Sequence, residues 1–175
     1  MPSNRRSLSV AETAKLLRTA LKDTHPGVKF SVRSHSYSGG ASVRVGWTDG
    51  PTQREVEATA QRYKGASFDG MTDMMSYHDT LLSTEDGAEL VSFGADFVSC
   101  SRTISPEFTA TLANEIATFT GQPYEHARNY HVITLSERRE TPAELYNSHH
   151  ERTRGSDILH QLAWTRPRPT APAAA

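Results

Sequence analysis

The chain has 175 residues, with 19 Lys or Arg and 20 Asp or Glu, so its net charge is close to zero. This length suits one domain with tails. The charge balance excludes a protein that is basic throughout, as many nucleic-acid-binding domains are, but it allows a local basic patch. One cysteine excludes an internal disulfide, and no apolar run approaches the roughly 20 residues of a membrane helix, so we expect a cytoplasmic protein without membrane contact.

Residues 1–8 are expected to be a flexible N-terminus. Ser9 and Glu12 have the spacing of a capping box and predict the start of a helix. An apolar stripe at helical spacing follows it: Val10, Ala14, Leu17 and Leu21. Pro26 and Gly27 predict the end of this helix.

Two alternating segments around Gly39-Gly40 predict a β-hairpin, because both glycines can adopt positive φ in a two-residue loop. This loop would place Val32 opposite Trp47 and His35 opposite Arg44. One face then belongs to the core and carries Phe30, Val32, Val43, Val45 and Trp47. The other face is expected to be exposed and carries Lys29, Arg33, His35, Tyr37 and Arg44.

A second capping box at residues 52–55 predicts another helix, and a loop is expected over residues 68–79. Residues 88–104 contain strand material, in which Gly94-Ala95 forms either the turn of a second hairpin or a kink in one strand. Ser105 and Pro106 predict a third helix, with an apolar stripe of Phe108, Leu112, Ile116 and Phe119.

Beyond this helix we expect a short strand at residues 131–135, a helix opening at Thr141 and a last helical segment over ILHQLAW. The Pro- and Ala-rich tail, residues 166–175, is expected to be disordered. The order is helix, β-hairpin, helix, second β-hairpin, helix and a helical C-terminal extension. The predicted fold class is therefore α+β, with residues 9–165 as a single domain.

Four motifs carry a resemblance to a known family: VAETAKLLRTAL, PGVKFSVRSHSYSGGASVRVGWTDGP, FDGMTDMMSYHD and FGADFVSCSR. On these residues, the stretch from Val10 to Arg102 resembles the large polyvalent protein-associated domain 29 family. The resemblance implies an α+β core over residues 10–102, followed by a helical part over residues 103–165. It also implies a module found in large proteins of phages and conjugative elements, which enter a recipient cell with the DNA. It identifies no catalytic residue.

The exposed hairpin face is the first candidate site. Its cations can meet phosphates, and the ring of Tyr37 can stack on an unpaired base, which favours single-stranded nucleic acid. The alternatives are an ordinary solvated strand face or a face that a later helix covers. A basic surface that extends from this face to Arg102 would favour the interpretation as a nucleic-acid-binding site.

A metal site is the second candidate, built on carboxylates near His78: Asp49, Asp69, Asp73 and Asp79. Carboxylate oxygens suit a hard divalent cation, but the spacing of these residues in the sequence differs from that of an EF-hand loop. Asp-Gly pairs such as Asp49-Gly50 and Asp69-Gly70 are also common in turns. The histidines at positions 126, 131, 149 and 150 match no zinc motif. We therefore expect neither a metal nor another cofactor, and Cys100 is interpreted as a small buried side chain.

No nucleophile elbow, phosphate-binding loop or dinucleotide fingerprint is present in the sequence. The leading hypothesis is a small non-catalytic binding module of a phage or mobile genetic element. It would act on nucleic acid or on a host protein during establishment in a recipient cell. The alternatives are a metal-dependent hydrolase that uses Asp69, Asp73, Asp79 and His78, and a structural or interaction protein of a virion or transfer complex.

Overall fold

The structure is a computed structural model, and it describes residues 5–71, 73–84, 87–127, 131–133 and 153–168. The chain divides into two compact units. Unit 1 contains the described residues up to Trp47 together with Gln53–Arg102, and unit 2 contains Thr48–Thr52 and the described residues from Thr103 to Arg168. Helices and small sheets in separate stretches of sequence confirm the α+β class.

Helix α1 (Val10–Thr24) starts as its sequence predicts. The backbone N–H of Ser9 donates to the Glu12 carboxylate at 2.9 Å, and the Glu12 N–H donates to the Ser9 hydroxyl at 3.3 Å, which completes the capping box. These two bonds satisfy N–H groups that have no partner within the helix. The predicted stripe is buried at Ala14, Leu17 and Leu21.

Strands β2 (Ser31–Tyr37) and β3 (Gly40–Thr48) form the predicted hairpin, but our pairing was wrong by two residues. Val32 lies opposite Val45 instead of Trp47, and Arg33 instead of His35 lies opposite Arg44. The loop is Ser38-Gly39, of which Gly39 has positive φ, so Gly40 belongs to the strand. A shift of two residues leaves each side chain on its face, and the predicted core and exposed faces are both correct.

The third strand of this sheet is β8 (Phe97–Thr103), in the order β2-β3-β8. The Asp96 N–H donates to the Ala41 carbonyl oxygen at 2.9 Å, and Gly46 lies beside Ser101. Residue numbers therefore rise together along the two strands, and β8 runs parallel to β3. Such a connection needs a crossover, which begins with helix α2 (Gln53–Ala60) and the 3-10 turn η1 (Gln61–Tyr63).

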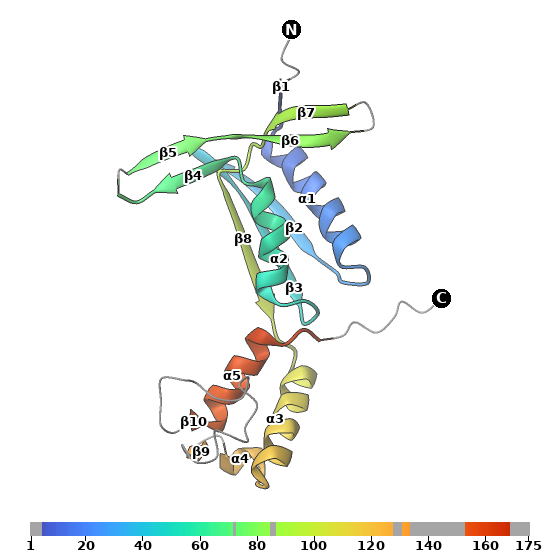
Figure 1. The fold of residues 1–175 in the computed structure, drawn as a ribbon, viewed down its shortest axis with the longest axis vertical. Coiled ribbons are helices and arrows are strands. Elements are labelled where there is room, and N and C mark those ends of the chain that lie inside the picture. The colour runs from blue at the N-terminus through green and yellow to red at the C-terminus, as the bar shows by residue number, and fades with distance from the viewer. Residues whose placement is uncertain (1–4, 72, 85–86, 128–130, 134–152, 169–175) are drawn as a thin grey trace. The chain divides into compact units, whose positions relative to one another are not determined.

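Helices α1 and α2 lie side by side against one face of this sheet (Figure 1). Their inward side chains join the inward face of the strands in one apolar core. The buried members are Ala14, Leu17, Leu21, Val32, Val43, Val45, Trp47, Val56, Ala60, Ala95 and Val98. Burial of this face fixes which side of the hairpin remains open to solvent.

The described residues between Ala66 and Ser92 form two strand pairs, where we expected a loop over residues 68–79. Strands β4 (Ala66–Asp69) and β5 (Met74–Tyr77) pair with each other, and β6 (Asp79–Thr84) pairs with β7 (Gly87–Ser92). Gly94-Ala95 is therefore neither a hairpin turn nor a kink, because the chain passes there from β7 to β8 in another sheet. Residues of the expected flexible N-terminus form β1 (Arg5–Ser7), which pairs with β7 in parallel.

Unit 2 is built on helix α3 (Pro106–Thr120), which Ser105 caps by accepting the Phe108 N–H at 3.1 Å. It also contains α4 (Tyr124–Ala127), β9 (His131–Ile133), β10 (Thr153–Arg154) and α5 (Gly155–Thr165). Its core consists of Phe108, Leu112, Ile116, Ala127, Ile158, Leu162 and Ala163. The helix expected from Thr141 and the side chain of Phe119 lie outside the described part.

A partly buried ionic group joins both ends of unit 2. The Asp49 carboxylate accepts the Ser105 N–H at 2.8 Å and pairs with the Arg168 guanidinium, which also donates to the Ser105 hydroxyl at 2.9 Å. Burial alone would raise the pKa of Asp49, but these bonds outweigh it and hold that pKa below its usual value. Arg168 belongs to the tail that was expected to be disordered, while residues 169–175 lie outside the description.

Cys100 packs against the unit 1 core, and burial, helped by the charge of Glu57, raises the pKa of its thiol to about 11. Because the thiolate is the reactive form, we expect the native thiol to be labelled at pH 8 on the order of a hundredfold more slowly than in urea. A chromogenic thiol reagent measures both rates. The Cys100 side chain is partly buried rather than fully buried as expected, and equal rates would contradict this partial burial.

Candidate functional site

The solvent-facing side of the β2-β3-β8 sheet, opposite the face packed against α1 and α2, is here called the open face. By strand alternation it carries side chains from all three strands. They are Arg33, His35 and Tyr37 of β2, Ser42 and Arg44 of β3, and Phe97, Ser99 and Ser101 of β8. Lys29 precedes β2 and is also exposed.

Two arginines face each other at the centre of the open face. Arg33 lies directly opposite Arg44 in the hairpin, and both side chains are exposed. Like charges at such paired positions repel each other and weaken a sheet. Within the part of the chain that the structure describes, neither guanidinium forms an ion pair. An anion bound between them would relieve this repulsion.

Aromatic side chains gather near the hairpin loop. The ring of Tyr37 is 44% exposed and lies over Gly40, where a Cβ would meet its Cε2 and hydroxyl at 3.1 Å. The His35 ring stacks beside it, with centroids 5.9 Å apart and planes inclined by 26°. Phe97, also 44% exposed, begins β8 on the same face. The open face therefore has an aromatic end and a basic centre.

Sequence reasoning placed Arg33, His35, Tyr37 and Arg44 on this face, but it missed the residues of β8, including Phe97. The segment FVSC gives an alternation, but it does not reveal that β8 lies beside β3. Arg102, whose continuity with the face we considered, is buried and alternates with Val98 and Cys100 on the other side of β8. It does not extend the basic centre.

The side chains of the candidate metal site point to separate partners. Asp79 pairs with Arg5 at 3.2 Å and accepts a hydrogen bond from Ser92. A ring nitrogen of His78 lies 3.0 Å from the Lys64 carbonyl oxygen, and Asp73 occupies a turn with φ of 53°. Among the described residues, no three acidic, His or Cys side chains come together as metal ligands. The side chain of Asp69 and residues 149–151 lie outside the description.

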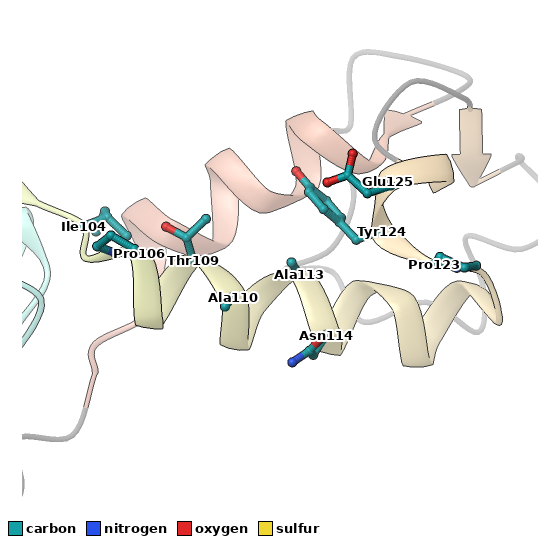
Figure 2. A pocket seen from close by; sticks show the side chains of 9 residues that line it. All are labelled: Ile104, Pro106, Thr109, Ala110, Ala113, Asn114, Pro123, Tyr124 and Glu125. Atoms are coloured by element: carbon teal, nitrogen blue, oxygen red, sulfur yellow. The ribbon is translucent and has the colours of Figure 1, made fainter.

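Unit 2 has an open groove of about 540 Å³ that the sequence did not indicate. Figure 2 shows its wall along one side of α3 and at the start of α4. The lining is Ile104, Pro106, Thr109, Ala110, Ala113, Asn114, Pro123, Tyr124 and Glu125. It is mainly apolar, and its polar side chains are Thr109, Asn114, Tyr124 and Glu125.

Unit 1 is thus an α+β domain with one sheet face left open. The sequence profile of the large polyvalent protein associated domain 29 matches residues 8–105, which is more than half of the chain. The chain belongs to this family, which is associated with phages and mobile elements. No curated protein and no solved structure matches the chain.

The family match ends close to the boundary between the two units. It covers every strand of the open face, while α3, α4 and α5 lie beyond it. Among the described residues, no helix is both long enough and apolar enough to cross a membrane.

Proposed function

We propose that unit 1 is a non-catalytic module that binds single-stranded nucleic acid on its open face. The observation that carries the proposal is the exposed Arg33-Arg44 pair, which has no acidic partner among the described residues and shares its sheet face with exposed aromatic rings. In a mobile-element protein, such a module would act on nucleic acid during establishment in a recipient cell.

The chemistry of the face favours unpaired strands. Tyr37 and Phe97 each present a ring that can stack on a base only when that base is not paired. Arg33, Arg44 and Lys29 supply the charges that meet the phosphates between stacked bases. Since the described residues place few cations at this face, binding should be weak, tolerant of sequence and strongly dependent on salt.

Replacing both arginines should remove most of the binding. We expect the double variant Arg33→Ala and Arg44→Ala to lose roughly tenfold to hundredfold in affinity for a single-stranded oligonucleotide at low salt, and its salt dependence to become flatter. The measurement is a fluorescence anisotropy titration of a labelled single strand at two salt concentrations. A duplex of the same sequence is titrated in parallel.

The matched control removes two arginines from the helical side of unit 1. Arg54 and Arg62 are exposed on α2 and η1, so the double variant Arg54→Ala and Arg62→Ala changes the net charge equally. It should retain nearly wild-type affinity. Equal losses in both double variants would show that only net charge matters, and no binding by the wild type at low salt would reject the proposal.

A protein partner is the second candidate. Large apolar side chains are exposed on the β4-β5 hairpin and on β6: Met71, Met74, Tyr77 and Leu81. Met71 is 97% exposed. Flexible methionines of this kind suit adaptable protein contacts, such as those with a host protein or within a transfer complex.

A further inference from the structure

The carboxylate of Asp96 lies at the aromatic end of the open face. It immediately precedes β8, and its Oδ2 accepts the backbone N–H of Ala41 at 2.7 Å. The Asp96 N–H donates in return to the Ala41 carbonyl oxygen at 2.9 Å. This reciprocal pair fixes the carboxylate beside the hairpin loop.

Asp96 and Tyr37 are neighbours across Gly40. A Cβ on Gly40 would lie 2.9 Å from Oδ2 of Asp96 and 3.1 Å from both Cε2 and the hydroxyl of Tyr37. A base stacked on the Tyr37 ring would therefore place an edge near this carboxylate. In the described part of the chain, Oδ1 of Asp96 has no hydrogen-bond partner.

A carboxylate only accepts hydrogen bonds, so it distinguishes bases by their donors. Cytosine, adenine and guanine carry exocyclic amino groups, whereas thymine and uracil have none. The donor on the pairing edge of thymine and uracil, N3–H, lies between two carbonyl oxygens that repel a carboxylate. A carboxylate also repels phosphates, which would keep the phosphates at Arg33 and Arg44 and leave the base at Tyr37.

We propose that Asp96 is a specificity residue that selects a base with an exocyclic amino group at the Tyr37 position. This inference rests on the proposed binding of single strands by the open face. It adds base preference to a surface whose arginines contact only phosphates.

The test compares labelled oligo(dC) and oligo(dT) of equal length at pH 7.5 and low salt. Because the two oligonucleotides carry equal charge, phosphate contacts contribute equally to both affinities. The ratio of the two affinities therefore reports the preference for one base over the other. We expect the wild type to bind oligo(dC) about fivefold to tenfold more tightly. In Asp96→Asn, the amide oxygen can keep the bond from Ala41 and turn the NH₂ group to the base, so the ratio should fall to one or favour oligo(dT).

Asp23→Asn is the control, because it removes an exposed carboxylate at the end of α1 and should leave the ratio unchanged. A wild-type ratio of one, or a ratio that Asp96→Asn leaves unchanged, would overturn this inference while the proposed function stands. The wild-type ratio alone can overturn the inference, so the test does not depend on whether the Asp96→Asn variant folds. Absence of binding to either oligonucleotide would overturn both proposals.

Discussion

Trp47→Ala is expected to destabilise the protein by about 3–5 kcal/mol, the usual cost of removing a large buried aromatic side chain. Trp47 is 4% exposed in the core between the sheet and its helices, and its ring packs on Phe30 with centroids 5.8 Å apart. Alanine would leave a cavity that the surrounding side chains fill only in part. Urea unfolding followed by circular dichroism measures the loss.

The other tryptophan of the chain provides the control. Trp164 is 43% exposed on α5, where it contacts the His160 ring. Trp164→Ala should change the free energy of unfolding by less than about 1 kcal/mol. Equal effects of the two substitutions would contradict the core that we assign to unit 1.

Gly65→Ala is expected to lower the free energy of unfolding by about 3 kcal/mol, near the upper end of the usual effect of overpacking. A Cβ at this position would lie 1.9 Å from the Phe93 carbonyl oxygen and 2.9 Å from its carbonyl carbon. These are backbone atoms, so the clash cannot be relieved by turning a side chain. Movement would also break the bond from the Gly65 N–H to the Ala95 carbonyl oxygen, 2.9 Å long.

Gly70→Ala is the matched control for this substitution. A Cβ on Gly70 meets no atom within 4 Å, and its φ is not in the left-handed region. Its thermal unfolding midpoint should stay within about 2 °C of the wild type. A Gly65→Ala protein as stable as Gly70→Ala would show that Gly65 and Phe93 are not in close contact.

The hairpin shows what the sequence determines and what it leaves open. The alternation of apolar and polar residues in β2 and β3 assigns each residue to a face of the sheet. A change of one residue in the position of a strand would bury Arg33 or Arg44, so it is excluded. A shift of two preserves the alternation, so the pattern cannot choose between loops at Ser38-Gly39 and Gly39-Gly40. The actual loop brings Arg33 opposite Arg44, and the proposed function depends on that pair.

Residues 66–92 were harder to predict because several of their large apolar side chains are exposed. Met74 and Leu81 lie in strands but remain accessible, so burial does not impose a clear period on the segment. Phe97 was missed for a different reason: β8 pairs with β3 across more than 50 residues of chain. Nothing local in the sequence marks such a pairing.

Asp49 illustrates how one residue type permits several interpretations. In the sequence, Asp49-Gly50 suggested a turn or a distant metal ligand. In the structure, Asp49 does adopt a turn conformation with φ of 56°, and its carboxylate pairs with Arg168. The partner lies 119 positions away, in a tail whose composition suggested disorder.

The most direct test of the open face as a binding surface is photo-crosslinking of a halogenated single-stranded oligonucleotide to the intact protein, with the site mapped by mass spectrometry. We expect adducts at Tyr37 or Phe97, which unlabelled single strand competes away and salt weakens. Adducts confined to α1, α2 or unit 2, or none at low salt, would contradict it.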